Sequence, residues 1–256
     1  MERRAFVQKS ILTTAAIAGA GLASAQKKPA GKEVYEFRVY HMRRSLKPLD
    51  NFFSSALMPA LNKMGIKNVG VFRETSLSEP AKIYMLIPYA SFEDFGKVST
   101  ALNNDADFLK ASTEYNNIPV DQSLYERFDS SLLLAFDGHP KMVVPSKDQK
   151  LFELRVYEGY SEDAVKRKVK MFNQGEIDIF KDVKLPSVFY GENIAGKDMP
   201  ALTYMAAYKS MEERDAVWKD FIVHPEWQKM SKLPEYANTV SKIHKIFLER
   251  LPYSQI

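Results

Sequence analysis

Apolar and polar positions alternate along residues 34–41, and this period of two predicts a β-strand. The spacing then becomes helical, with apolar side chains three or four positions apart, until Gly65 follows as a typical C-cap. The apolar positions of this predicted helix are Leu46, Leu49, Phe53, Ala56, Leu57, Ala60, Leu61 and Met64. Residues 67–74 and 83–89 predict two further strands, joined by a turn near Pro80.

A second helix is marked by its first residues. Ser91 and Asp94 form a capping box, in which a hydroxyl and a carboxylate satisfy backbone N–H groups at the helix start. Ser210 and Glu213 repeat the pattern later in the chain. The apolar run at residues 132–136 predicts a closing strand. The resulting order, β-α-β-β-α-β, is the ferredoxin-like arrangement, in which two helices cover one face of a sheet.

The chain repeats itself. Residues 35–40 (YEFRVY) recur at residues 152–157 (FELRVY), an offset of 117. Further segments recur in the same order at offsets of 117 and 119, which indicates a duplication. We therefore expect an α+β fold of two tandem ferredoxin-like (βαββαβ) repeats, residues 33–138 and 151–253, packed sheet to sheet. Residues 139–150, rich in proline and lysine, are the expected linker.

The first 25 residues predict an export signal rather than part of the fold. A charged segment precedes the small apolar run at residues 11–20, and Ala23-Ser24-Ala25 is a typical cleavage site. Arg3-Arg4 followed by Phe6 and Val7 resembles the twin-arginine (Tat) motif, with ordinary Sec export as the alternative. The apolar run is shorter than the roughly 20 residues of a membrane span. We expect a periplasmic or secreted protein with no integral membrane segment once the signal is removed.

Several segments taken together resemble the NIPSNAP family of the dimeric α+β barrel superfamily. They are the Glu36-x-Arg38-x-Tyr40 strand, the Gly65-Ile66-Lys67 turn into Val69-Gly70-Val71-Phe72, the strand end Tyr89-x-Ser91 and the helix start His224-Pro225-Glu226-Trp227. The resemblance implies two sheets that face each other as a barrel, but little about activity, because the family's biochemical function is largely unassigned. Superfamily neighbours include cofactor-independent monooxygenases, haem-degrading enzymes and small isomerases. The second copy departs from the pattern, since Gly175 falls inside its first helix, and we expect a kinked helix and an altered pocket there.

Strand alternation places chemically active side chains on one face of each copy. We expect Tyr35, Phe37 and Val39 to face the helices, while the other parity points into the space between the sheets. The inward residues are then Glu36, Arg38 and Tyr40 in the first copy and Glu153, Arg155 and Tyr157 in the second. A buried charge must be paired, so these residues either form Glu–Arg pairs or line a ligand pocket. In a pocket, the arginines would anchor a carboxylate and the tyrosines would donate to a substrate oxygen.

The four histidines do not form a metal motif. His41, just beyond the first strand, is either a base at the mouth of the pocket or an exposed loop residue. We expect His244 to lie on the solvent side of the last strand. The sequence predicts no metal site and no cofactor.

Composition narrows the function classes further. With no cysteine, thiol catalysis, cysteine-bound zinc, iron–sulfur clusters and disulfides are excluded. A formal net charge of +4 in 256 residues gives no support to nucleic-acid binding.

Three functions remain open. The first is a barrel that binds a small acidic or hydrophobic organic ligand between its sheets. The second is a cofactor-independent monooxygenase or isomerase, and the third is a structural or partner-binding protein with a filled core. Assembly into a homodimer is also compatible with the sequence.

Overall fold

The structure is a computed structural model that describes residues 31–76 and 80–256. The predicted signal peptide, residues 1–25, lies outside the described residues. The first half contains β1 (Val34–Met42), α1 (Lys47–Phe52), η1 (Phe53–Leu57), α2 (Met58–Lys63), β2 (Gly70–Glu74), β3 (Lys82–Tyr89), α3 (Phe92–Asn103), α4 (Ala106–Ala111), α5 (Thr113–Asn116), η2 (Val120–Gln122) and β4 (Tyr125–Ala135). The second half contains β5 (Leu151–Glu158), α6 (Glu162–Met171), η3 (Phe172–Glu176), α7 (Ile177–Asp182), β6 (Ser187–Ala195), β7 (Ala201–Tyr208), α8 (Met211–Val223), α9 (Pro225–Met230), η4 (Pro234–Tyr236) and β8 (Lys242–Arg250). No helix among the described residues is long and apolar enough to cross a bilayer.

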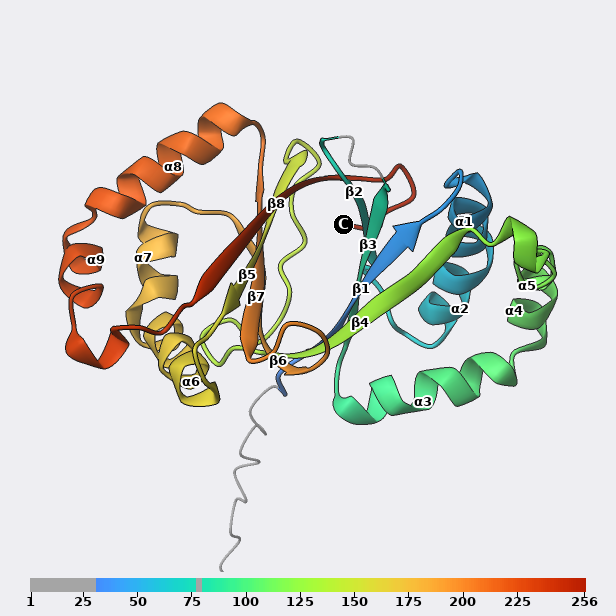
Figure 1. Cartoon of the computed structure of the whole chain (residues 1–256), viewed down its shortest axis with the longest axis horizontal. Helices are drawn as coiled ribbons and strands as arrows, with labels where there is room; N and C mark the ends of the chain where they lie inside the picture. The colour runs from blue at the N-terminus through green and yellow to red at the C-terminus, as the bar shows by residue number, and fades with distance from the viewer. Residues whose placement is uncertain (1–30, 77–79) are drawn as a thin grey trace, which may run out of the picture. The chain divides into compact units, whose positions relative to one another are not determined.

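The eight strands form a closed barrel in the order β1-β3-β2-β8-β5-β7-β6-β4. Strands β1–β4 are neighbours, as are β5–β8, and all the pairings are antiparallel. The two groups of four meet at two seams, β2 with β8 and β4 with β6. Figure 1 shows the helices of each half outside the barrel, against the strands of that half. The barrel therefore closes within one chain through two short seams, at residues 72–74 of β2 and residues 132–135 of β4.

The interior of the barrel is an apolar core drawn from both halves. Tyr35 and Phe37 of β1 pack there with Phe152 and Leu154 of β5. Val39 packs at the edge of the same cluster. A second core lies between β1–β4 and their helices, and a third lies between β5–β8 and theirs. Both faces of each strand group are therefore buried.

This arrangement corrects the predicted orientation of the two strand faces. Tyr35, Phe37 and Val39 face the interior of the barrel, and Glu36, Arg38 and Tyr40 lie under the helices of the first half; the same inversion applies to Glu153, Arg155 and Tyr157. The prediction was wrong because a period of two separates the faces of a strand without saying which one meets the helices. The interior between the sheets is packed with apolar side chains at its centre, whereas the outer face of β5 meets Arg214 and Trp218 of α8, which are partners for Glu153.

The helix after the first strand of each half contains one wide, π-helical turn. In the first half, α1, η1 and α2 continue one another, as the apolar spacing predicted, and Gly65 follows with a positive φ of 84°. In the second half the predicted kink is confirmed, because Gly175 within η3 departs from helical geometry. After the end of α7, Lys184 has a positive φ of 59°, where Gly65 stands after α2.

The predicted N-caps of α3 and α8 are confirmed. The hydroxyl of Ser91 accepts a hydrogen bond from the backbone N–H of Asp94 at 3.1 Å. The hydroxyl of Ser210 accepts one from the backbone N–H of Glu213 at 3.4 Å. Each serine is extended and thus marks a sharp chain reversal between a strand and its covering helix.

Candidate functional site

A cluster of charged and aromatic residues lies between β5 and the helices of the second half. Strand alternation brings Glu153, Arg155 and Tyr157 to the outer face of β5, beneath α6 and α8. Glu153 is 0% exposed and Arg155 is 8% exposed. Groups this deeply buried require partners, which the helices supply.

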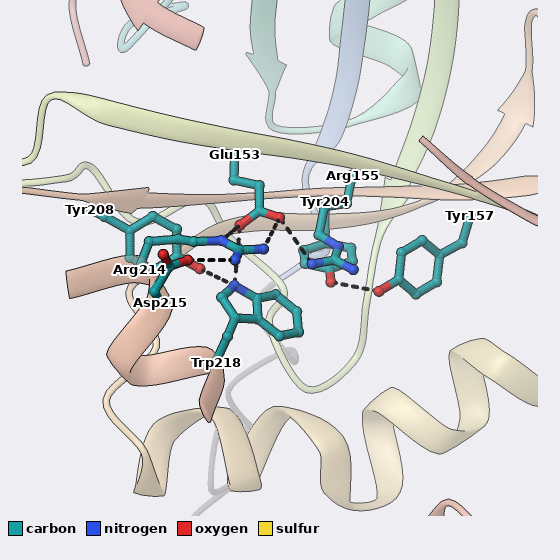
Figure 2. Close-up of polar contacts among 8 residues, drawn as sticks. All are labelled: Glu153, Arg155, Tyr157, Tyr204, Tyr208, Arg214, Asp215 and Trp218. Atoms are coloured by element: carbon teal, nitrogen blue, oxygen red, sulfur yellow. Dashed lines mark hydrogen bonds and ion pairs between the residues drawn. The ribbon is translucent and has the colours of Figure 1, made fainter. Parts of the chain in front are cut away.

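The carboxylate of Glu153 is held by three side chains (Figure 2). Arg155 donates from Nη1 to Oε1 at 3.0 Å. Arg214 of α8 makes a two-pronged contact, from Nε to Oε2 at 2.9 Å and from Nη2 to Oε1 at 3.0 Å. Trp218, one turn further along α8, donates from Nε1 to Oε2 at 3.1 Å. Bidentate charge-assisted bonds are strong and fix geometry, so Glu153 orients both guanidinium groups.

Arg155 keeps donor capacity that Glu153 does not use. Among residues 31–76 and 80–256, its buried Nε has no hydrogen-bond partner. Its guanidinium lies over the ring of Trp218, 4.1 Å from the centroid, a cation–π contact that holds the group in place. An unpaired buried N–H is costly, and such an atom in a native structure calls for an explanation.

A second buried ion pair lies close by. Lys168 of α6 donates to Glu176 Oε2 at 2.7 Å, and the two residues are 5% and 2% exposed. Desolvation raises the pKa of the Glu176 carboxyl above its ordinary value, although Lys168 and Arg155 oppose the shift. The Lys168 ammonium also lies over the rings of Phe172 and Trp227.

These side chains border a cleft of about 470 Å³ between the strands and the helices. Its walls are formed by Arg155, Tyr157, Lys168, Glu176, Arg214, Trp218, Phe221, Ile222, Trp227, Val240, Ile243 and Lys245. Four of these are cations and one is an anion, and even with Glu153 beneath them the positive groups predominate. The walls are otherwise aromatic and aliphatic. This combination suits an anion attached to an apolar body.

The phenols beside Arg155 act as donors or acceptors, not as anions. Tyr157 and Tyr204 share a hydrogen bond of 3.0 Å between their hydroxyls. Burial raises the pKa of both phenols, against the influence of Arg155. Tyr157 lines the cleft, as the sequence interpretation required of it, but it lies on the outer side of the barrel.

In the first half, the corresponding residues Glu36, Arg38 and Tyr40 hydrogen bond to one another. Arg38 donates to both carboxylate oxygens of Glu36, at 2.6 and 2.9 Å, and from Nη1 to the hydroxyl of Tyr40 at 3.4 Å. Glu36 also accepts from Tyr89 and Ser130, each at 2.9 Å. Burial alone would raise the pKa of Glu36, but these donors outweigh it and hold the pKa below its ordinary value. The predicted Glu–Arg pairs thus occur in both halves.

What differs between the halves is the helix above the pair. Counted from the π-helical turn, Leu49 and Leu57 of the first half stand where Lys168 and Glu176 stand in the second. Both leucines are buried in the apolar core of the first half. The second half therefore carries the polar cleft, and Glu36, Arg38 and Tyr40 belong to a tightly packed counterpart.

Two histidines lie away from this cleft, on the inner surface of the barrel. His41 hydrogen bonds to Asp129 at 2.8 Å, and both line a cavity inside the barrel. The structure therefore separates His41 from the six other predicted site residues. His244 lines the same cavity, which corrects the expectation that it faces solvent; the inversion of the strand faces also accounts for this error.

Sequence reasoning missed Arg214, Trp218, Lys168 and Glu176. The signal for the first two was their separation by four residues, which places both on one face of a helix. Arg214 lies on the side of α8 that faces β5, but the surrounding sequence of α8 is strongly charged and looks solvated by composition alone. Among the described residues, no group of three or more histidine, aspartate or glutamate side chains is arranged to hold a metal ion.

Comparison with known proteins places this geometry in context. Residues 152–255 match the NIPSNAP family model. Among curated protein sequences no match is found.

Solved structures share the fold at low sequence identity. A candidate monooxygenase from Fusobacterium nucleatum is 11% identical with a TM-score of 0.57, over 86% of this chain and 93% of that one. A candidate monooxygenase from Lactobacillus acidophilus is 10% identical with a TM-score of 0.56, over 86% and 94%. An anthrone oxidase-like protein is 9% identical with a TM-score of 0.53, over 86% and 92%. At these identities the likeness concerns the fold alone. The chain is thus similar to the NIPSNAP family over residues 152–255, and its mixed α and β fold is that of the solved structures above.

Proposed function

We propose that the cleft of the second half binds a small organic anion with an aromatic or apolar body. The observation that carries the proposal is the guanidinium of Arg155, which lines the cleft and donates only Nη1 to Glu153. Glu153 and Trp218 hold the guanidinium in position before any ligand arrives. Preorganised donors of this kind bind carboxylates with little loss of conformational freedom.

The walls support the same ligand class. The cleft's volume, about 470 Å³, falls within the range of small-molecule sites. Phe221 and Trp227 offer flat apolar surfaces, and their ring centroids lie 4.4 Å apart. Lys245, on the outer face of β8, adds an exposed positive charge that favours the approach of an anion.

The surrounding architecture fits a tandem origin for this site. We infer that residues 33–138 and 151–253 are two ferredoxin-like copies joined by the linker 139–150, exported by a Tat-type or Sec-type signal at residues 1–25. The support is the shared order β-α-β-β-α-β and a π-helical turn at the same place in each half. In this view the proposed anion site belongs to the second copy.

Tryptophan fluorescence tests the proposal directly, because both tryptophans of the chain line the cleft. Titration with benzoate is expected to change the emission saturably, whereas the uncharged isostere benzamide has a much smaller effect. Arg155→Lys keeps the charge but loses the bidentate geometry, and it should weaken benzoate binding about tenfold or more. Arg38→Lys in the first half is the matched control and should bind benzoate like the wild type.

Equal responses to benzoate and benzamide, or unchanged benzoate binding in Arg155→Lys, would refute the assignment. Native mass spectrometry of protein purified from its own host provides an independent readout. A bound anion that is lost in Arg155→Lys and kept in Arg38→Lys would identify the natural ligand class by its mass.

A second candidate is proton transfer on such a ligand, favoured by the raised pKa of Glu176 beside Arg155. A carboxylate with a raised pKa is a better general base near neutral pH. In an aromatic 2-oxo acid, Glu176 would take the proton from the carbon beside the carbonyl and return it to the carbonyl oxygen, which forms the enol. Arg155 would stabilise the oxyanion during the transfer.

Phenylpyruvate reports this chemistry, because its keto and enol forms absorb differently. The wild type should accelerate their interconversion, and Glu176→Gln should abolish the acceleration while phenylpyruvate still binds. An unchanged rate in Glu176→Gln would leave the cleft as a binding site without this activity.

A further inference from the structure

The interior of the barrel is filled at one end and open at the other. At the filled end, Tyr35, Phe72, Phe152 and Ile256 are buried together. Toward the other end a cavity of about 290 Å³ begins beside Phe37 and Leu154. It is lined by Phe37, Val39, His41, Lys82, Tyr84, Asp129, Ser131, Leu154, Val156, Asn193, Lys197, Asp198, Thr203, His244 and Ile246. We call the polar end of this cavity the barrel mouth. Its histidines, His41 and His244, have side chains 21% and 31% exposed.

Two histidine–carboxylate pairs stand at the barrel mouth, one from each half. His41 Nε2 lies 2.8 Å from Asp129 Oδ2, across β1 and β4. His244 Nε2 hydrogen bonds to Glu158 Oε1, across β8 and β5. In the first half, Val39 pairs with Asp129, and in the second half the corresponding Val156 pairs with His244. In the first half the imidazole is on the first strand, β1, and the carboxylate is on the last, β4. In the second half the carboxylate is on the first strand, β5, and the imidazole is on the last, β8.

The carboxylates determine which imidazole nitrogen is free. Burial acts to raise the pKa of Asp129, but His41 and Lys197 outweigh it and hold the pKa below the ordinary value. An ionised carboxylate only accepts, so the nitrogen that faces it carries a proton. In the neutral imidazole, Nδ1 of His41 is then an acceptor, and the same logic applies to His244 beside Glu158. Within the described residues, neither Nδ1 has a hydrogen-bond partner.

Charge at the barrel mouth is closely balanced. Lys82 lies 3.8 Å from Glu74, Lys197 lies 3.4 Å from Asp129, and Lys242 lies 4.0 Å from Glu158. Asp198 adds one further negative charge to the lining. Apart from the two imidazoles, these groups offer no unmatched cation for an anion. They do offer two imidazole acceptors above an apolar chamber.

We propose that the barrel mouth is a second binding site, separate from the cleft, for a small phenol or a similar hydroxyl-bearing apolar molecule. The ring of the ligand lies among Phe37, Leu154 and Val156, and its hydroxyl donates to Nδ1 of His41 or His244. In the complex, a sufficiently acidic phenol gives its proton to Nδ1 and stays as the phenolate, while the carboxylate at Nε2 faces the imidazolium that forms. The bound phenolate and the imidazolium then form one additional ion pair at the barrel mouth.

The test uses 4-nitrophenol, whose phenolate form has its own absorption band, and 4-nitroanisole, which has no hydroxyl to donate. Wild-type full-length protein is expected to bind 4-nitrophenol saturably, with an increase in the phenolate band at a pH below the probe's own pKa. It should bind 4-nitroanisole much more weakly. His41→Gln and His244→Gln keep a donor toward the carboxylate but remove the base. Each should weaken binding several-fold, and the double variant about tenfold or more, which corresponds to about 1.4 kcal/mol.

Two further variants keep the result decisive. Val156→Phe fills the chamber and leaves both histidines in place, so it should abolish binding even if a histidine variant fails to fold. Arg155→Lys separates this site from the cleft. Binding that is lost in Arg155→Lys but kept in the double histidine variant would locate the probe in the cleft and overturn the proposal. Saturable binding that is unchanged in Val156→Phe, or no saturable binding in the wild type, would overturn it as well.

Discussion

The contribution of the buried pair of Lys168 and Glu176 to stability can be tested with leucine substitutions, because the first half carries leucines at the two corresponding positions. Lys168→Leu alone leaves the Glu176 carboxylate without its partner in a position that is 2% exposed. Breaking a buried pair in this way costs about 3–5 kcal/mol in the free energy of unfolding. Adding Glu176→Leu removes the stranded charge, and replacement of a whole buried pair by apolar residues is about neutral or stabilising by up to about 4 kcal/mol. The double variant should therefore be more stable than the single one.

The dependence on pH follows from the same pair. The folded pKa of Glu176 is raised, mainly by desolvation, so the folded state binds more protons than the unfolded state between the two pKa values. The contribution of this carboxyl to stability is then fully present below its unfolded pKa and is lost as the pH rises through the folded pKa. Removing Lys168 takes away a group that lowers the pKa, so the folded pKa rises further. The destabilisation caused by Lys168→Leu should be greatest near neutral pH and smaller in acid.

Urea unfolding, followed by the emission of Trp218 and Trp227, measures the wild type, Lys168→Leu and the double variant at neutral and acidic pH. The exposed pair Lys170–Glu235, at 2.6 Å with both side chains 47% exposed, is the matched control, and Lys170→Leu should change stability little. A double variant that is no more stable than Lys168→Leu would refute the reasoning, as would a loss in Lys168→Leu that does not shrink in acid.

Three further predictions concern the fold. Lys184→Gly should stabilise the protein by about 1 kcal/mol in thermal unfolding, since its φ is 59°, while Gly65→Ala, at φ 84° with open space around it, should destabilise by a similar amount. The pKa of Glu36 is lowered in the folded state, so its contribution to stability is present above the unfolded pKa and is lost as the pH falls through the folded pKa. Glu36→Gln should therefore make stability fall less steeply in acid. Arg38→Met should cost about 3–5 kcal/mol in the free energy of unfolding at neutral pH. Ser210→Ala should cost about 1 kcal/mol in urea unfolding through loss of the α8 N-cap.

Each of these has an outcome that contradicts it. A Lys184→Gly protein that melts below the wild type would mean that Lys184 makes a contact worth more than its backbone strain. An acid limb that is as steep in Glu36→Gln as in the wild type would show that other carboxyls control acid unfolding. A neutral Ser210→Ala would mean that water replaces the cap.

The periodicity of the sequence identified β1, β2, β3 and the helix after β1 in their order, because apolar spacing depends on local geometry; it located only the end of β4 and did not predict α4 or α5. It did not determine which face of a strand looks inward. In this barrel both faces are buried, so Phe37 and Tyr40 are both core residues although they lie on opposite faces. Hydrophobicity therefore could not distinguish the interior of the barrel from the helix side.

The sequence identified only part of the candidate site, because it revealed residues mainly where a pattern is repeated. The Glu153-x-Arg155-x-Tyr157 strand repeats a pattern and so was visible as a repeat. Arg214 and Trp218 have no equivalents in the first half and were visible only as a spacing of four. The histidine pairs at the barrel mouth were hidden because His41 corresponds to a glutamate and His244 to an aspartate, so a search for a repeated histidine finds nothing.

Closure of the barrel within one chain has a consequence for symmetry. In a barrel assembled from two identical chains, every substitution appears twice, and a change that helps one site must be tolerated at the other. Here the halves are covalently joined, so each position varies independently. Leu49 and Leu57 pack one half with apolar side chains while Lys168 and Glu176 are buried in the other. The apolar half can thus support a costly polar arrangement in the other half.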